Sequence, residues 1–218
     1  MSLAIFDLDE TLISGDSDYL WGEFIVEKGI VDKAHHQEKN RHFYEQYKQG
    51  KLDVNAYLRF ACSVLASISM DTLIELREEF IDTRIKPLVL PEAVKIVNSH
   101  KSSHDHVLII TSTIDFITRP IGELLGIVDL IAPIPEQQDG QYTGQITGIP
   151  SFGQGKVDCL MEWLDDKPYS TQGSYFYSDS INDLPLLEFV DHPRAVDPDD
   201  RLRQIATSRG WQIISFRG

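Results

Sequence analysis

The sequence predicts an α/β protein in which a doubly wound parallel sheet carries a helical insertion after its first strand. Short apolar runs, bounded by turn or acidic residues, alternate with helical patterns, as is typical of parallel strands joined by helices. Residues 14–86, in contrast, contain no convincing strand. The apolar runs are Leu3–Leu8, Val107–Ile110, Val128–Ile134, Ser174–Tyr177 and Trp211–Ser215.

Helix start and stop signals agree with this Rossmann-like alternation. Residues Pro91–Lys101 begin with proline at the first helical position, where its missing N–H costs nothing. Residues Phe116–Leu125 lead into Gly126, and Asp199–Ser208 is followed by a glycine at position 210, which is the usual helix stop. The pair Asp139-Gly140 lies between alternating residues and predicts a β-hairpin turn.

The insertion divides the chain into a core of residues 1–13 and 87–218 and a helical cap of residues 14–86. Apolar residues in the cap recur at helical spacing, as at Tyr19, Leu20, Phe24 and Ile25. Ligands of an open parallel sheet bind beyond the carboxyl ends of its strands, so an insertion at that point is expected to cover the site as a lid. The alternative is a helical subdomain that covers nothing.

Charge and composition restrict the partners. The net charge of −14 and the absence of a Lys/Arg cluster argue against nucleic acid and anionic membranes. No apolar run reaches the ~18 residues of a membrane span, and two cysteines are too few for a disulfide framework. We therefore expect a cytoplasmic protein. A small phosphate ester is not excluded as a ligand, because a metal ion and a lysine can make a site locally positive, and the oligomeric state stays open.

The first chemical signal is a pair of carboxylates, Asp7 and Asp9, directly after the apolar run Ala4-Ile5-Phe6. This position is where a buried strand would give way to a loop at the carboxyl edge of the sheet. A bend after Asp7 would let one carboxylate attack a substrate while the other reaches the leaving oxygen. Acidic residues also end strands as turn formers or helix caps, so the pair alone leaves both interpretations open.

Three further polar segments follow predicted strands or begin helices. The hydroxyls and amides of Thr111 and Ser112 are suited to phosphate oxygens, although they also suit a helix cap. Lys156 follows Gly155 at a predicted helix start, where a cation is disfavoured unless an anion lies nearby; a solvated lysine is the alternative. Asp179 and Asp183 add two hard oxygen ligands of the kind that magnesium prefers.

These four segments together resemble the four motifs of haloacid dehalogenase-like hydrolases. The resemblance spans nearly the whole chain and is nearest to the phosphoserine-phosphatase-like branch (subfamily IB), which has a helical cap between the first two motifs. Gly15–Asp18 with Trp21, and Thr111–Thr113 followed by Phe116–Ile121, are similar to a bacterial subgroup with members assigned as histidinol-phosphate phosphatases. The four motif segments are Phe6–Thr11, the strand ending in Thr111, Gly155-Lys156 and Ser178–Asp183.

The resemblance implies a covalent mechanism. Asp7 would attack phosphorus and form an aspartyl phosphate, while Asp9 would protonate the leaving group and later activate water. Mg²⁺ would be held by Asp7, by the backbone carbonyl of Asp9 and by Asp179, with Asp183 acting directly or through water. The phosphoryl oxygens would be held by Thr111, Ser112, Lys156 and Asn182.

Residues of the cap are the candidates for contact with the leaving group of the substrate. Asp16, Ser17 and Asp18 lie at the start of the cap, where the two acids favour a cationic substrate such as an amino-alcohol phosphate. The resemblance to the bacterial subgroup implies histidinol phosphate. A solvated acidic face is the alternative. If the substrate is instead phosphoserine, Arg41 or Arg59 is the expected partner of its carboxylate.

Two other functions share these residues. A phosphomutase uses the same two aspartates and differs in whether water or a second hydroxyl accepts the phosphoryl group. A phospho-accepting receiver-type signalling domain also combines acids, a Thr or Ser and a Lys on a doubly wound sheet. The order of its motifs and its lack of a long helical insertion argue against the receiver interpretation.

Overall fold

The computed structural model describes residues 2–218 and contains a six-stranded parallel sheet. The strand order is β3-β2-β1-β6-β7-β8, and every neighbouring pair is parallel. The first strand therefore lies in the middle of the sheet, where all four of its residues are fully buried. The strands are β1 (Leu3–Phe6), β2 (His106–Ile110), β3 (Asp129–Ile131), β6 (Tyr175–Ser178), β7 (His192–Val196) and β8 (Gln212–Ile214). The predicted fold class is confirmed.

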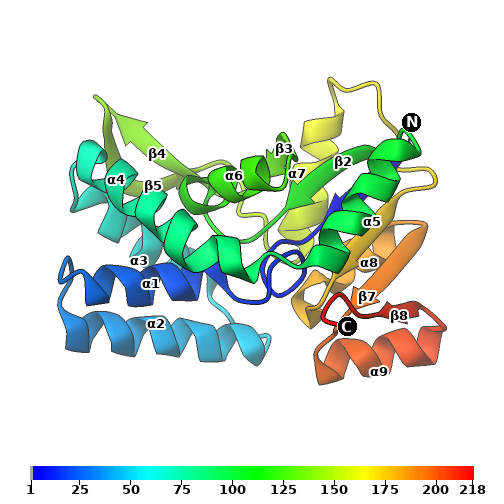
Figure 1. Cartoon of the computed structure of the whole chain (residues 1–218), viewed down its shortest axis with the longest axis horizontal. Helices are drawn as coiled ribbons and strands as arrows, with labels where there is room; N and C mark the ends of the chain where they lie inside the picture. Colours follow the sequence, from blue (N-terminus) through cyan, green and yellow to red (C-terminus); the bar gives the residue numbers. More distant parts are fainter. Residues whose placement is uncertain (1) are drawn as a thin grey trace.

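Helices cover both faces of this sheet (Figure 1). Successive residues of β1 point to opposite faces, so Phe6 joins one apolar cluster and Ile5 the other. The first cluster is packed by α5 (Pro91–Ser102) and α6 (Asp115–Leu124). The second is packed by α7 (Gln154–Leu164), α8 (Leu184–Phe189) and α9 (Asp200–Arg209). Two helix layers around one sheet make the doubly wound arrangement.

The insertion is helical, as predicted. Its helices are α1 (Ser17–Glu27), α2 (Lys33–Lys48), α3 (Val54–Ala66) and α4 (Met70–Phe80), followed by the short turns Ile81–Ile85 and Lys86–Leu88. An Asp or Ser side chain accepts a hydrogen bond from a backbone N–H at the start of each of the four helices, which explains where each begins.

The two ends of the insertion lie side by side. Ile13 and Val89 form an antiparallel bridge, and the backbone N–H of Ser14 donates to the Leu88 carbonyl at 2.9 Å. The chain thus leaves and rejoins the core at one place, which suits a cap attached by a paired connection. The division into core and cap domains stays our interpretation of this geometry.

The predicted hairpin is confirmed as β4 (Ile134–Gln138) and β5 (Gln141–Thr147). Asp139 and Gly140 both have positive φ angles, 52° and 77°, which a two-residue turn of this type requires. The hairpin packs against cap helix α3, where a Cβ at Gly144 would lie 3.7 Å from the Ala66 Cβ. A segment of the core sequence thus extends the cap (Figure 1).

Two strand predictions need correction. The run Val128–Ile134 is not one strand, because β3 ends at Ile131 and Ile134 begins the hairpin after Pro133. Strand β7 was not predicted, since Pro193 and its polar neighbours argue against a strand inside a sheet. Only Ala195 and Val196 of β7 are buried, so its sequence carries little apolar signal.

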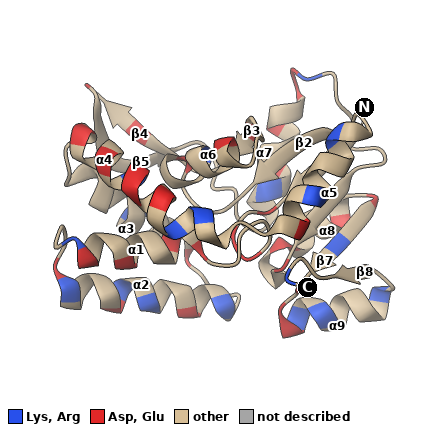
Figure 2. Ribbon diagram, viewed as in Figure 1, with Lys and Arg blue, Asp and Glu red and all other residues tan. Residues whose placement is uncertain are grey.

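Lys and Arg are distributed over separate helices rather than gathered on one face, as the ribbons of α2, α5 and α9 show (Figure 2). No single helix within residues 2–218 is long and apolar enough to cross a membrane. The helical segments Val54–Ala66 and Met70–Leu88 are long and apolar enough only when taken together, and the chain bends by 111° between them. Many of their apolar residues belong to the core.

Candidate active site

The carboxyl ends of β1, β2 and β6 lie next to one another and bring the predicted motif residues together. The backbone N–H of Asp7 donates to the Tyr177 carbonyl at 2.9 Å, so Asp7 continues the pairing of β1 with β6. Asp7 is therefore in line with its strand, whereas Asp9 lies on the loop that follows, and the chain turns sharply at the next residue, Glu10, which has a positive φ of 56°.

Lys156 lies between two carboxylates in the interior. Its Nζ donates to Asp7 Oδ1 and to Asp183 Oδ2, each at 2.8 Å, and the three residues are 1 %, 4 % and 2 % exposed. Burial opposes the ammonium, but the two carboxylates outweigh it and raise the pKa of Lys156. The preceding residue must be glycine, because a Cβ at Gly155 would lie 2.1 Å from the Pro150 carbonyl oxygen.

Asp183 is fully engaged by its neighbours. Its Oδ1 lies 2.7 Å from Lys156 Nζ, and its Oδ2 also accepts a hydrogen bond from Ser178 Oγ at 2.7 Å. The structure therefore favours the orienting role among the two roles predicted for Asp183, rather than direct contact with a metal ion.

Asp9 is held by the start of the cap. The backbone N–H of Ser17 donates to its Oδ1 at 2.6 Å, and Thr113 Oγ1 donates to its Oδ2 at 2.9 Å. Burial, reinforced by the charge of Asp16, raises the pKa of Asp9 to about 7. A carboxyl group with this pKa can give and take a proton near neutral pH, as a general acid and base must.

The carboxylates at this edge outnumber their cation. Burial raises the pKa of Asp7 to about 7, although Lys156 opposes the shift. Burial and the charges of Asp7 and Asp183 raise the pKa of Asp179 well above its usual value. Thr11 fixes Asp179 by donating from Oγ1 to Oδ1 at 3.2 Å and accepting from the backbone N–H at 3.1 Å. Asp7, Asp179 and Asp183 can carry three negative charges beside the single positive charge of Lys156, so a bound cation would improve the charge balance of the site.

The donor set suits Mg²⁺. Within residues 2–218 no three His, Cys, Asp or Glu side chains converge as ligands of one ion. Mg²⁺ does not need three, because it commonly binds one or two carboxylates and keeps several waters. The carboxylates of Asp7 and Asp179, with the Asp9 carbonyl, therefore fit it.

The hydroxyl segment after β2 lies at the same edge. Thr111 is buried, and its Oγ1 accepts a hydrogen bond from the Thr113 backbone N–H at 3.2 Å. Ser112 Oγ donates to the Ser151 carbonyl at 3.0 Å, and Ser151 Oγ donates to the Thr111 carbonyl at 2.6 Å. The loop that would hold phosphate is thus tied to the loop that precedes α7.

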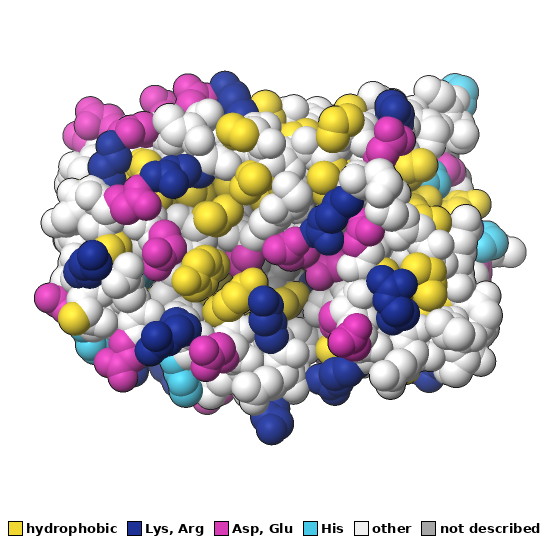
Figure 3. All heavy atoms as spheres, turned by 60° about the horizontal axis from the view of Figure 1, so that its bottom comes forward, with side chains coloured by type: hydrophobic (Ala, Val, Ile, Leu, Met, Phe, Trp, Pro, Cys, Tyr) yellow, Lys and Arg dark blue, Asp and Glu magenta, His cyan; other side chains and the backbone are white. Residues whose placement is uncertain are grey.

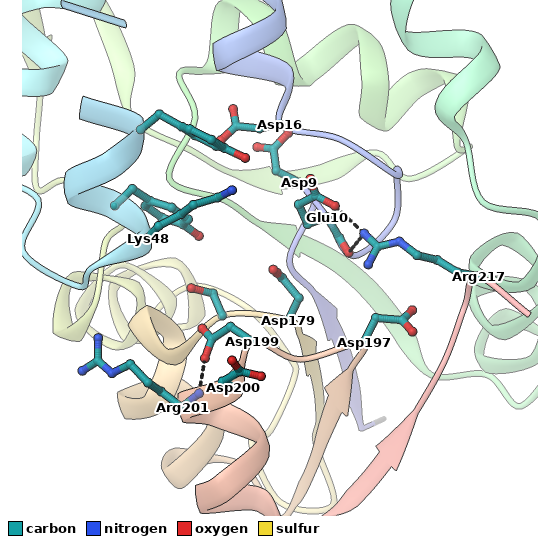
Figure 4. A pocket seen from close by; sticks show the side chains of 13 residues that line it. Asp9, Glu10, Asp16, Lys48, Asp179, Asp197, Asp199, Asp200, Arg201 and Arg217 are labelled. Carbon is teal, nitrogen blue, oxygen red and sulfur yellow. Dashed lines mark hydrogen bonds and ion pairs between the residues drawn. The ribbon is translucent and has the colours of Figure 1, made fainter. Parts of the chain in front are cut away.

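A cavity of about 520 Å³, lined by Asp9 and Asp179 among others, opens between the core edge and α2 (Figure 4). Seven of its lining residues are acidic and three are basic. Arg217 pairs with Glu10, and Arg201 donates to the Gln49 carbonyl at 3.0 Å. Acidic side chains also gather near the middle of the face drawn in Figure 3. The charged lining residues are Asp9, Glu10, Asp16, Asp179, Asp197, Asp199, Asp200, Lys48, Arg201 and Arg217.

The cap touches the core beside this cavity. Asn182 Nδ2 donates to the Tyr47 carbonyl at 3.1 Å, and the Arg201 contact reaches the same end of α2. Burial and the charges of Asp179, Asp7 and Asp183 raise the pKa of Tyr47 well above its usual value. The insertion therefore covers the edge as a lid, and Asn182 contacts the cap here.

The predicted leaving-group residues separate into two sets. Asp16 lines the cavity, and Asp18 lines a recess beside it. Ser17 is fully buried, and its backbone N–H donates to Asp9. Arg41 is exposed and lines a separate hollow with Glu38, and Arg59 is exposed on α3 outside the cavity and the recess. The structure gives neither arginine a place near the catalytic edge.

Sequence reasoning missed several residues at the site. Thr113 was noted only as part of a hydroxyl run, although it orients Asp9. Tyr44, Tyr47 and Tyr57, which line the recess, were not predicted as site residues. No local pattern identifies them, because each faces the cavity or recess only once the cap has packed on the core.

The fold and the catalytic edge together define a hydrolase with an acidic, lysine-bridged active site. The chain belongs to the haloacid dehalogenase-like hydrolase family, whose model matches residues 4–188. The suspected family membership and the phosphatase class are thereby confirmed, and the receiver-type alternative is wrong.

Three known proteins are similar to this chain. A histidinol-phosphatase from Neisseria meningitidis is 42% identical over 220 residues, covering 99% of each chain. A crystal structure of a protein of unknown function from Bordetella pertussis is 41% identical, with a TM-score of 0.93 and coverage of 99% and 98%. A phospho-aspartyl intermediate analogue of phosphoserine phosphatase shares the fold at 18% identity, with a TM-score of 0.72 and coverage of 99% and 93%.

Proposed function

We propose that this protein is a Mg²⁺-dependent phosphatase that hydrolyses a small phosphomonoester through a phosphorylated Asp7. The observation that carries the proposal is the position of Asp7, held by buried Lys156 at the carboxyl edge of β1, beside Asp179. This arrangement supplies a nucleophile, a fixed positive charge and a cation site within one small volume.

The residues divide the reaction between them. An oxygen of Asp7 attacks phosphorus, and the leaving alkoxide takes the proton of Asp9, which releases a neutral alcohol. Asp9 then removes a proton from water as the water attacks the same phosphorus, so that the P–O bond to Asp7 breaks and inorganic phosphate leaves. Thr113 and the Ser17 N–H keep Asp9 in position for both proton transfers.

Charge on the phosphoryl group is offset by Lys156, while Thr111 and Ser112 offer hydroxyls and amides to its oxygens. Mg²⁺ bound by Asp7, Asp179 and the Asp9 carbonyl would neutralise negative charge and orient the phosphoryl group. Asn182 would donate a hydrogen bond either to the phosphate or to the Tyr47 carbonyl, and the second contact holds the cap against the core.

The substrate we propose has a cationic leaving group, and histidinol phosphate is the first candidate. An acidic cavity favours an amino alcohol over an anionic group, and the Neisseria relative is named for that substrate. Phosphoserine is the second candidate. Lys48 lines the cavity and forms no ion pair within the described chain, so its ammonium can bind the carboxylate of phosphoserine. A phosphomutase would instead show a requirement for a bisphosphate.

The test is phosphate release by purified protein with Mg²⁺ from histidinol phosphate, phosphoserine, phosphoethanolamine, glycerol phosphate and a sugar phosphate. We expect turnover of at least one, and a loss of at least ~10³-fold in kcat for Asp7→Asn. Asp158→Asn, an exposed change on α7, is the matched control and should keep wild-type activity. Asp7→Asn acting as well as wild type, or no release from any ester, would refute the proposal.

A further inference from the structure

A small recess of about 50 Å³ lies between cap helices α1, α2 and α3 and the loop of Thr113. It shares Asp16, Tyr44 and Tyr47 with the lining of the main cavity, so the two spaces adjoin. Two carboxylates and five aromatic rings line it, and no Lys or Arg does. A space of this volume holds more than one water molecule, and therefore the end of a ligand.

Asp18 is the charged group of the recess that the catalytic residues leave unused. Within residues 2–218 no Lys, Arg or His forms an ion pair with it. Burial raises the pKa of Asp18 to about 7, and the hydroxyl of Tyr57, which is 8 % exposed on α3, opposes that shift. Tyr57 and Asp18 both line the recess, and the Tyr57 hydroxyl favours the ionised form of Asp18.

A hollow next to the recess contains a second polar group, whose ring nitrogen lacks a hydrogen-bond partner in the described residues. Asp18 and Asn40 line this hollow of about 10 Å³, which His36 lines from α2. His36 is 5 % exposed, and its Nε2 is buried without a hydrogen-bond partner in the described residues. Buried polar atoms are normally paired, so an unpaired one lining this hollow points to a polar ligand group nearby.

We propose that this recess binds the cationic end of the leaving group, an ammonium or a protonated imidazole, and that Asp18 is its specificity-determining residue. The inference rests on the proposed function. The carboxylate of Asp18 supplies the opposite charge, and the aromatic lining of the recess suits an organic cation. An ester with a neutral end would leave the Asp18 carboxylate without an opposite charge, so the recess selects against it.

The test compares kcat/KM for histidinol phosphate and for glycerol phosphate in wild type, Asp18→Asn and Tyr57→Phe. We expect Asp18→Asn to lose ~10–100-fold for histidinol phosphate and less than ~3-fold for glycerol phosphate. Tyr57→Phe should show the same selectivity with a smaller loss. Glu38→Gln removes an exposed acid on α2 outside the recess and should change neither value. Retained turnover of glycerol phosphate shows that each variant is folded.

Equal losses for both esters in Asp18→Asn, or none, would overturn the inference while leaving the phosphatase proposal intact. If wild type hydrolyses no ester, the proposed function fails. Calorimetric measurement of histidinol binding then tests whether the recess binds a cationic group. Binding to wild type that Asp18→Asn weakens at least tenfold supports the recess. Equal binding to both, or binding to neither, overturns it.

Discussion

Replacing Lys156 by methionine should destabilise the protein strongly, because it removes one partner of a buried ionic cluster. Methionine keeps most of the side-chain length, so packing changes little. Asp7 and Asp183 remain, 4 % and 2 % exposed, without the ammonium that lies within 2.8 Å of both. Breaking a buried pair in this way costs about 3–5 kcal/mol. At ~2–4 °C per kcal/mol for a chain of this size, Tm should fall by ~6–20 °C.

The assay is thermal unfolding followed by circular dichroism at pH 7.5 with a chelator, so that no divalent ion substitutes for the ammonium. Lys95→Met, which removes an exposed lysine paired with Glu92, is the control and should shift Tm by less than ~2 °C. Adding Asp7→Asn to Lys156→Met should recover part of the loss, because one unpaired carboxylate is removed. The reasoning is wrong if Lys156→Met melts within 2 °C of wild type, or if Asp7→Asn lowers its Tm further.

Two further predictions concern pH and the orientation of Asp9. Because burial raises the pKa of Asp16 and of Asp18 from 3.8 to about 7, the folded state holds more protons than the unfolded state, and the free energy of unfolding should fall as pH rises towards 7. We expect the free energy of unfolding, measured by denaturant titration from pH 5.5 to 8, to depend less on pH in the double variant Asp16→Asn/Asp18→Asn than in wild type. An equal pH dependence in both proteins would contradict this. Thr113→Val removes the donor to Asp9 Oδ2; kcat should fall ~10-fold and the pKa of Asp9 in the kcat profile should rise, whereas exposed Thr207→Val should leave both unchanged.

Much of the catalytic edge could be predicted from sequence because it depends on local order. Asp7, Thr111 and Asp179 each follow a buried strand, and parallel strands place their carboxyl ends at one edge. Lys156 follows a glycine at a helix start, a position where a cation needs an anion nearby. Strand β7 escaped prediction because His192, Pro193 and Arg194 carry no apolar signal.

The cap shows what lay beyond the sequence. Helical spacing predicts that α1 to α3 have apolar and polar faces, but it does not say which polar face meets the core. Asp18 and Arg59 are both polar residues on cap helices, yet one lines the recess and the other is exposed. Likewise Ser17 contributes a backbone N–H to Asp9, which no side-chain pattern reveals.

The sequence by itself therefore determined the doubly wound sheet, the helical insertion and the acids and lysine at the carboxyl edge, because the alternation of strands and helices and the strand ends follow from short-range patterns. Only the tertiary structure decided that Lys156 bridges Asp7 and Asp183, that Thr113 and the start of α1 hold Asp9, and that an acidic, aromatic recess lies beneath the cap. Those contacts join residues far apart in the chain, and they arise from the packing of α1 to α3 against the core.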